Sequence, residues 1–409
     1  MDMKAAVDRL ASNLGAEVVE LLRRRPRQAV EAINARGFRR RKRATLWTGY
    51  AYGNLKEYFD WDLYFDNIFF SYLGESRYCR NNLEAFLDEQ LACGFVSRTL
   101  LEPRARQHFK PFLCQIALLG SRQTGDYRWL KGRYFERLRK YLDYWFWYCD
   151  FDRNGLPVWD SADHTGMDNQ GRRGGVMNAM EVEGVDLACY LTRELEAFAI
   201  LAGKVGEPEA SANANQHAAE LKGLINQVFW HEGDGFYYDR NERSDEPVRV
   251  KSVAGLIPLW LGIVPTDRAE RLVTQHLLNA EEFWLPYPVA TWAKAEPDYY
   301  QGSRRGECNW RGPAWVPTNY MIFHGLEKSG YRDRARELAY RTFEMVMGEP
   351  DTREYYNAET GSGLGQNPFL GWSLLAYAMP LEYELGYDPT DIGREHIVPI
   401  LSQALDIEF

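Results

Sequence analysis

Apolar side chains recur at steps of three and four residues through most of the chain, and this spacing limits the fold more than any other feature of the sequence. Side chains at this spacing share one face of a helix, so each such stretch predicts a helix with a buried face. The chain is therefore expected to consist almost entirely of helices. The clearest stretch, 127–149, has apolar residues at Phe135, Leu138, Leu142, Trp145 and Phe146.

This spacing predicts about a dozen helices and little strand. One short hairpin is expected at 233–239, where an Asp-Gly turn precedes alternating residues. The expected helices span residues 3–24, 27–36, 63–73, 76–92, 109–122, 127–149, 183–203, 208–229, 251–262, 266–280, 313–328, 331–347 and 369–384.

No Pro-rich or Ser-rich linker divides the chain, and successive helices are joined by loops of unequal length. A chain of 409 residues usually forms several domains, but a barrel can keep a long chain in one unit. We therefore expect an all-α fold, an (α/α)6 barrel with long functional loops. It is expected to form a single catalytic domain over residues 1–409, whose motif-bearing core spans residues 40 to 390.

Aromatic residues make up 14% of the chain, with 13 Trp and 25 Tyr. Such residues fill large cores, and they also line sugar sites, because a flat ring stacks on the apolar face of a pyranose. Composition alone favours the core interpretation. The net charge is −9, and acidic and basic residues are mixed along the chain. The sequence therefore shows no basic surface of the kind that binds nucleic acid.

The six cysteines form no CxxC pair, and no zinc-type spacing of cysteine and histidine occurs. Phosphate-binding and dinucleotide fingerprints are absent as well, so we expect neither metal nor cofactor. Residues 1–25 are charged and amphipathic, unlike a signal peptide, and no stretch has the length of a membrane span. We expect a cytoplasmic protein without a membrane partner, and its oligomeric state stays open.

Four segments between or beside the helices combine aromatic residues with acidic residues, glycine or both: 59–65, 159–170, 310–315 and 354–372. Glycoside hydrolysis needs one protonated and one ionised carboxyl group beside the scissile bond, and Asp168 and Glu354 lie in two of these loops. In a barrel both loops can open on one rim, so the two carboxylates are expected to face each other across a pocket. Taken singly, each acid also fits a turn, a helix cap or an exposed loop.

In their order along the chain, the segments resemble glycoside hydrolase family 63 and, more distantly, the trehalases. Residues 61–65, 166–169, 310–315 and 354–361 match the family's blocks. The resemblance implies an (α/α)6 barrel and an inverting hydrolase that removes α-linked glucose or mannose from a small glycoside or oligosaccharide by single displacement. It implies Asp168 as general acid and Glu354 as general base.

The extra β-domain of the large processing glucosidases in this family is not expected here. The resemblance therefore points to the compact bacterial branch, whose members include enzymes acting on small glycosides such as mannosylglycerate and glucosylglycerate. Departures from the family's common residues at Thr165, Gln170, Cys308, Asn309 and Ala358 leave the sugar and the leaving group open.

Further residues are expected to contact the sugar, with packing inside the helix ring as the alternative for each. The carboxyl group of Asp62 can accept hydrogen bonds from sugar hydroxyls, and Gln115 resembles a family glutamine that contacts the sugar. The planar guanidinium group of Arg311 can donate two parallel hydrogen bonds. Tryptophans near the acid and in the later segments are expected to shield it or to stack on the sugar. The full set is Trp61, Asp62, Tyr64, Gln115, Trp159, Arg311, Gly312, Trp315 and Trp372.

Three other functions fit the same barrel. An inverting phosphorylase needs a cationic phosphate pocket in place of the base, and a sugar epimerase or isomerase uses histidine pairs that these loops lack. An inactive sugar-binding protein is the third, and the presence of both carboxylates favours the hydrolase over it. Positive residues that can recognise a carboxylated leaving group such as glycerate, or merely be surface charges, are Arg104, Arg106, Lys110, Arg172, Arg173, Arg304 and Arg305.

Overall fold

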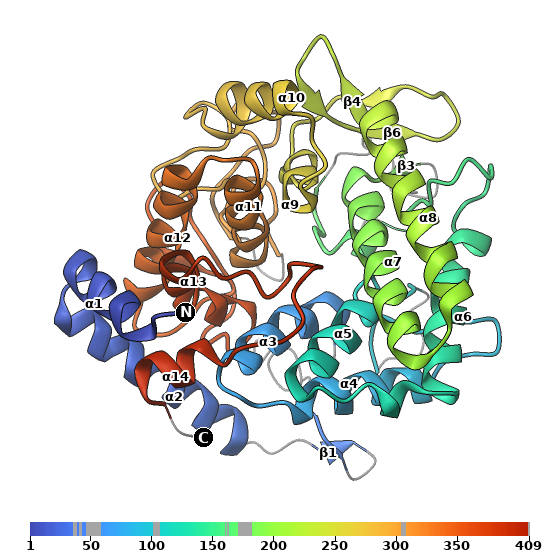
Figure 1. Cartoon of the computed structure of the whole chain (residues 1–409). Coiled ribbons are helices and arrows are strands. Elements are labelled where there is room, and N and C mark those ends of the chain that lie inside the picture. Colours follow the sequence, from blue (N-terminus) through green and yellow to red (C-terminus); the bar gives the residue numbers. More distant parts are fainter. Residues whose placement is uncertain are drawn as a thin grey trace.

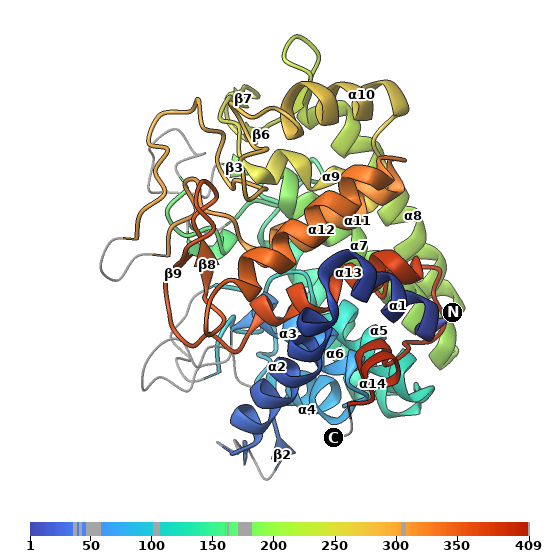
Figure 2. The ribbon, with the colours of Figure 1, turned by 90° about the vertical axis from the view of Figure 1, so that its left-hand side faces the viewer.

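The predicted helices close into a ring, which Figure 1 shows along its axis and Figure 2 from the side. The computed structural model describes residues 1–35, 39–40, 43–45, 59–100, 107–159, 161, 163–170, 182–303 and 308–407. Its α-helices are α1 (Met3–Leu14), α2 (Ala16–Ala35), α3 (Asp60–Tyr72), α4 (Arg77–Asp88), α5 (Leu113–Thr124), α6 (Arg133–Tyr148), α7 (Val185–Val205), α8 (Pro208–Leu224), α9 (Pro258–Leu261), α10 (Thr266–Arg271), α11 (Val316–Lys328), α12 (Arg332–Met347), α13 (Met379–Leu385) and α14 (Ile400–Leu405).

Shorter helical turns extend or connect these helices, and small antiparallel sheets lie in the loops. The turns are η1 (Arg128–Leu130), η2 (Asp163–Thr165), η3 (Ile225–Phe229), η4 (Val253–Leu256), η5 (Leu272–Leu277) and η6 (Trp372–Tyr377). The strands are β1 (Arg39–Arg40), β2 (Arg43–Ala44), β3 (Val182–Glu183), β4 (Trp230–His231), β5 (Phe236–Tyr237), β6 (Asp239–Asn241), β7 (Pro247–Val248), β8 (Tyr355–Tyr356) and β9 (Gly363–Leu364). They pair as β1–β2, β3–β6–β7, β4–β5 and β8–β9.

The inner wall of the ring runs through α3, α5, α7, α9, α11 and η6, each in contact with the next, and η6 returns to contact α3. The helices α4, α6, α8, α10 and α12 follow the inner elements in sequence and form the outer layer, while α2 packs against η6. This alternation confirms the predicted (α/α)6 barrel.

Inner and outer helices differ in their burial. Every residue of α3 is buried, as are Val316 to Leu326 of α11, because these helices are covered on all sides. The outer helix α6 buries one stripe that includes Phe135, Leu138 and Trp145. Helices that are apolar all round belong inside a protein and striped helices belong at its surface, so the sequence pattern itself sorts the two layers.

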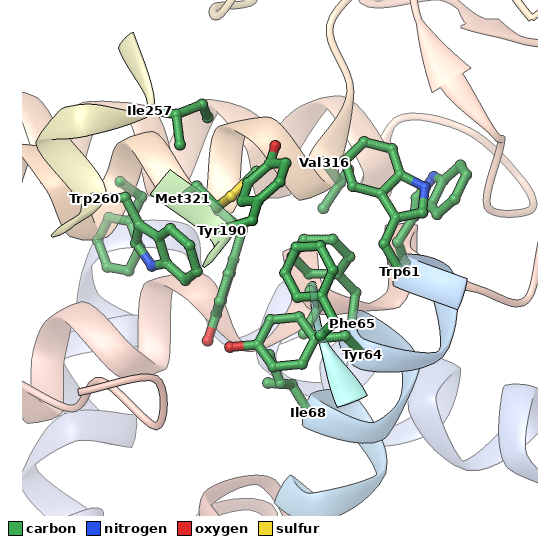
Figure 3. Close-up of a cluster of buried hydrophobic side chains, with 14 of the residues drawn as sticks. Trp61, Tyr64, Phe65, Ile68, Tyr190, Ile257, Trp260, Val316 and Met321 are labelled. Carbon is green, nitrogen blue, oxygen red and sulfur yellow. The ribbon is translucent and has the colours of Figure 1, made fainter. Parts of the chain in front are cut away.

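Aromatic rings fill the middle of the barrel (Figure 3). Trp61, Tyr64 and Phe65 come from α3, Tyr190 from α7 and Trp260 from α9, and all five are buried. Each such ring removes roughly 150–250 Å² from water, so these residues dominate the energetics of the core. For this set, the core interpretation of the aromatic content is confirmed.

The two predicted N-terminal helices divide at a different place. Helix α1 ends at Gly15, whose φ of 91° suits glycine, and α2 then runs through Pro26. The prediction of a break near residue 25 was therefore wrong. A proline removes one backbone donor, but packing of the amphipathic face keeps this helix continuous. The predicted hairpin at 233–239 is confirmed by the pairing of β4 with β5.

The two ends of the ring carry different segments. The hairpin β8–β9 lies at one end, and the chain between α13 and α14 lies at the other (Figure 2). In the part of the chain that the structure describes, no helix combines the length and apolarity needed to cross a bilayer.

Candidate active site

A pocket of about 90 Å³ opens where the loops before α3, α7, α11 and η6 meet. It contains both acidic and aromatic side chains. The wall is formed by Phe59, Trp61, Asp62, Arg98, Gly166, Asp168, Cys308, Trp310, Trp315 and Trp372.

Asp168 belongs to this wall and is held by a well-braced loop. Gly166 has a φ of 79°, and a Cβ atom there would come within 2.8 Å of the Trp61 ring, so only glycine fits. On the other side, the amide oxygen of Asn169 accepts a hydrogen bond of 2.8 Å from the backbone N–H of Trp310. These contacts fix the backbone on both sides of the acid.

Glu354 immediately precedes β8 and is only 2% exposed. Its Oε1 accepts a hydrogen bond of 3.4 Å from the thiol of Cys308, and its Oε2 accepts one of 3.1 Å from the backbone N–H of Gln366. Its carbonyl oxygen accepts the indole N–H of Trp372 at 2.9 Å. Cys308 is thus a residue of the pocket wall that contacts this carboxylate.

Tryptophans from separate elements make the apolar part of the wall. Trp310 and Trp315 are stacked with ring centroids 3.8 Å apart, and Trp315 stacks on Tyr355 at 4.5 Å. Trp61 lies 5.6 Å from Trp310, and Trp372 lies 5.6 Å from Trp315. The loop that holds Glu354 is therefore joined through aromatic contacts to the start of α3.

Asp62 lies in the first turn of α3 and is 4% exposed. Burial, and secondly the charge of Asp60, raise the pKa of Asp62 to about 8. At neutral pH this carboxyl group therefore carries a proton and can donate as well as accept a hydrogen bond. Asp60 itself is fully buried in an ion pair with Lys110, with Nζ 2.8 Å from Oδ1.

Two residues predicted to contact the sugar lie on a second cavity, which faces the opposite end of the ring. Tyr64 is two residues beyond Asp62 on α3, and Gln115 lies in the first turn of α5. Residues two apart on a helix point about 200° away from each other, because each residue turns the helix by about 100°. This explains why Asp62 and Tyr64 line different cavities.

Three further predicted residues brace the pocket from outside its wall. The indole N–H of Trp159 donates to Oδ1 of Asp186 at 3.1 Å, and the ring packs under His164 of the acid loop. Nε of Arg311 donates to the carbonyl oxygen of Asn169. Gly312 has a φ of 143°, and a Cβ atom there would meet the carbonyl oxygen of Tyr300 at 2.8 Å.

The structure brings a cation to the pocket that the sequence did not single out. Arg98 belongs to the wall, in a stretch with no helical spacing and no match to a family block, so no sequence signal marked it. Lys110 is fully buried against Asp60. The other positive candidates, Arg104, Arg106, Arg172, Arg173, Arg304 and Arg305, lie outside the described residues.

Over the described ranges, no three histidine, cysteine or acidic side chains are gathered so as to hold a metal ion. The pocket places the carboxyl groups of Asp62 and Asp168 beside an aromatic surface.

The chain is similar to known proteins in both sequence and fold. Residues 56–373 match the family model described as the mannosylglycerate hydrolase MGH1-like glycoside hydrolase domain. The mannosylglycerate hydrolase of Thermus thermophilus is 31% identical over 149 residues, which are 36% of this chain and 33% of that protein. A probable mannosyl-oligosaccharide glucosidase of Schizosaccharomyces pombe is 29% identical over 210 residues, which are 47% of this chain and 25% of that protein. The matched stretches thus span a quarter to a third of these curated relatives.

A crystal structure of the family 63 mannosylglycerate hydrolase of Thermus thermophilus in complex with glucose is similar over most of its length. The TM-score is 0.71 at 21% identity, and the match covers 86% of this chain and 98% of that one. At this identity the likeness concerns the fold, and it agrees with the ring of helices described above.

Proposed function

Because the chain belongs to the family of mannosylglycerate hydrolase MGH1-like glycoside hydrolase domains, within glycoside hydrolase family 63, we propose that it hydrolyses a small α-glycoside of glucose or mannose. Asp168 is the general acid and Glu354 the general base of a single displacement. One observation carries this proposal. The acid lies in the wall of a tryptophan-lined pocket, and Oε1 of the base accepts a hydrogen bond from Cys308 of the same wall.

The sugar ring occupies the pocket against the tryptophans. Trp61 and Trp372 supply apolar surface for its C–H face. Asp62, protonated at neutral pH, donates one hydrogen bond to a sugar oxygen and accepts another from a hydroxyl. Such paired contacts fix the orientation of the ring, which is what brings the glycosidic oxygen to the acid.

The reaction transfers two protons. Asp168 gives its proton to the glycosidic oxygen while the bond from that oxygen to the anomeric carbon breaks. A water molecule attacks the anomeric carbon from the opposite face, and Glu354 takes a proton from it. The released sugar then has the β configuration. Such a mechanism requires roughly 6.5–9.5 Å between the carboxyl groups, which leaves room for the water.

The leaving group is a carboxylated one, and Arg98 is the residue that recognises it. Arg98 belongs to the same wall as Asp168, where the leaving group departs. A guanidinium group binds a carboxylate through two parallel hydrogen bonds, and a buried neutral wall offers no such contact. The mannosylglycerate hydrolase among the relatives acts, by its name, on a glycoside of this chemical kind.

The test is proton NMR of the anomeric signals during the first minutes of hydrolysis of α-mannosylglycerate and α-glucosylglycerate. Release of the β-anomer is expected, and Asp168→Asn and Glu354→Gln should each abolish it at matched enzyme concentration. Initial release of the α-anomer, or an adduct on Glu354 with a slow fluorinated substrate, would mean a double displacement instead.

The same experiment separates the rival reactions. A phosphorylase releases a sugar phosphate, and only when phosphate is added. An epimerase changes the sugar but leaves the glycosidic bond intact. No turnover of any α-glycoside, together with binding that survives in Asp168→Asn, would indicate a sugar-binding protein.

A further inference from the structure

One outer helix carries apolar side chains on the face that it turns to solvent. This helix, α6, lies at the outer edge of the ring in Figure 1. Over the described residues, five large apolar residues are exposed, and four of them lie on or beside α6. Their exposed fractions are 58% for Leu91, 66% for Trp147, 53% for Tyr148 and 50% for Phe151. Single exposed apolar residues are common, but such a gathering marks an interaction surface.

The position of Leu91 beside α6 follows from contacts of the neighbouring backbone. The side-chain amide of Gln90 donates to the carbonyl oxygen of Arg137 at 2.8 Å. The turn that follows packs closely on the same helix, because a Cβ atom at Gly94 would collide with the carbonyl oxygen of Lys140. Leu91 therefore lies beside the first half of α6, and the three aromatic residues lie at its C-terminal end.

A groove of about 250 Å³ runs next to these residues, between α6 and α8. Most of its lining is apolar, and the apolar lining residues are Leu142, Phe146, Leu195, Phe198, Ala210 and Ala214. Asp143 lines it too, and Trp147 follows Asp143 by one turn of α6, so Trp147 stands at the end of the groove. A cavity of about 150 Å³ already accepts benzene, so the groove has room for an aromatic side chain.

The charges of α6 indicate which partner suits this surface. Residues 133–140 contain four basic residues and one acidic residue, whereas residues 141–152 contain three aspartates and no basic residue. Two copies of the helix that pack antiparallel therefore place the basic half of each against the acidic half of the other. Arg139 and Asp143 already pair within the helix at 3.6 Å, so the contact between copies falls to the exposed Lys140 and Asp152.

The apolar residues fit the same antiparallel order. Tyr148 lies on the side of α6 away from the groove, because it stacks on Tyr144, whose ring contacts Phe95 in the turn after Leu91. In a two-fold pair of antiparallel helices, the grooves of the two copies face each other. Trp147 of one copy then meets the groove of the other, and Tyr148 meets Leu91 of the other.

The area of this surface can be compared with that of known interfaces. From their exposed fractions, the three aromatic side chains offer roughly 250–420 Å², because each buries about 150–250 Å² when it is covered completely. A stable interface buries about 800 Å² on each partner. The aromatic residues thus supply a third to a half of this area, and Leu91, the groove and the charged side chains around them supply more.

From these observations we propose that this surface, which we call the α6 face, binds a second copy of the chain to form a two-fold dimer. The α6 face consists of Leu91, Trp147, Tyr148, Phe151 and the groove between α6 and α8. Trp147 of each copy enters the groove of the other. A second copy suits the surface because a protruding side chain, a groove that receives it and charges of both signs all occur on one face, as a two-fold interface requires.

Sedimentation velocity of the full chain tests the proposal from about 1 to about 100 μM, a range that spans the Kd values of weak and moderate interfaces. The sedimentation coefficient should rise with concentration toward that of a dimer. Trp147→Ala should raise the Kd of the dimer by roughly 30-fold or more, as for a tryptophan at the centre of an interface. Its circular dichroism spectrum should match that of the native chain, because the side chain is exposed.

The control is Arg334→Ala, an exposed position on the outer helix α12, which should leave the Kd unchanged. A native chain that stays monomeric at every concentration would overturn the proposal, because the α6 face would then belong to another partner. A dimer whose Kd is the same in Trp147→Ala would also overturn it, because the two copies would then associate through another surface.

An exchange of charges tests the antiparallel order without an apolar variant. Lys140→Glu and Asp152→Lys each bring like charges together, so each variant alone should dimerise more weakly than the native chain. An equimolar mixture should restore association, because the acidic side chain introduced in one copy meets the basic side chain introduced in the other. A mixture that sediments like the separate variants would refute the antiparallel contact.

The inference does not rest on the proposed hydrolysis, because the α6 face contributes no residue to the wall of the active-site pocket. Asp168→Asn should therefore dimerise with the same Kd as the native chain. The two proposals can fail separately.

Discussion

The thiol of Cys308, which lines the pocket, lies 3.4 Å from Oε1 of Glu354. A thiol is a weak donor, so it places the carboxylate without strongly stabilising its charge. The other carboxylate oxygen, Oε2, accepts the backbone N–H of Gln366 at 3.1 Å, a contact that no side-chain substitution removes. The residue at position 308 is therefore expected to set the basicity of Glu354.

Replacing Cys308 tests this relationship. Cys308→Ser supplies a stronger donor and should move the acidic limb of the pH profile of kcat/KM to lower pH, whereas Cys308→Ala should move it to higher pH. Shifts of about one unit correspond to one hydrogen bond to a charged group. Cys93→Ser, at an exposed cysteine, is the control. Shifts in the same direction for both variants would contradict the expectation.

Asp168→Asn should lower kcat on an alkyl glycoside by about two to four orders of magnitude, the range for a lost general acid. A glycoside with a very good leaving group needs less protonation, so part of the rate should return with it. The residue lies in a loop and is only partly buried, so the circular dichroism spectrum should match that of the native chain. Full activity on the alkyl glycoside would refute the assignment.

Gly365→Ala should impair catalysis more than it impairs folding. At this residue φ is 70°, and a Cβ atom would come within 2.5 Å of Oε2 of Glu354, so the carboxylate must move. Gly386→Ala is a matched control, because φ is 58° there and nothing lies within 4 Å of the added atom. Both variants bear the backbone strain, and only Gly365→Ala should lose kcat. Equal losses would show that strain alone matters.

Arg98→Met should raise KM for a glycosylglycerate by roughly 10- to 100-fold, as expected when a charged hydrogen bond is lost. The neutral glycosylglycerol serves as the control substrate, and its KM should change little. Steady-state kinetics on the two substrates measure this difference. If both KM values rise together, Arg98 acts on the pocket as a whole and not on the carboxylate.

His324→Gln should change how stability depends on pH. His324 is buried with Nε2 3.1 Å from Glu382 and Nδ1 3.7 Å from Asp388. Although burial opposes its charge, these acids raise its pKa from 6.5 to about 9. A raised histidine pKa gives stability that is complete below the unfolded value and is lost as pH rises through the folded value.

The Tm difference between the native chain and His324→Gln should therefore be largest near pH 6 and shrink as pH approaches 9. Differential scanning calorimetry from about pH 6 to about pH 10 measures it, with Arg139→Lys as an unaffected surface control. A constant difference across this range would mean that the imidazole acts through packing alone.

Much of this molecule was predictable from local patterns. Helical spacing predicted the helices, and the resulting helix count without a domain break predicted the ring. Which helices are inner and which are outer was seen only in the structure. The spacing gave wrong helix ends in the N-terminal segment. There the first helix ends at Gly15, and the second continues through Pro26. The order of the motifs also singled out the loops that carry Asp168 and Glu354.

The wall of the pocket was less predictable. Arg98 and Cys308 belong to it, whereas Gln115, Tyr64 and Arg311 face elsewhere. A sequence gives the position of a residue along a helix or loop, but the direction of its side chain toward the axis depends on how six inner elements are rotated against one another. That rotation is set by the packing of rings such as those of Trp61, Tyr190 and Trp260.

The sequence by itself determined the helices and the choice of two candidate carboxylates, since these follow from spacing and chemistry within short segments. Only the tertiary structure decided that Cys308 contacts Glu354, that Asp62 lines the pocket with a raised pKa and that Arg122 and Arg193 line one second cavity. These relationships join residues far apart in the chain. Their energies depend on burial and on neighbouring charges, which exist only once the ring has closed.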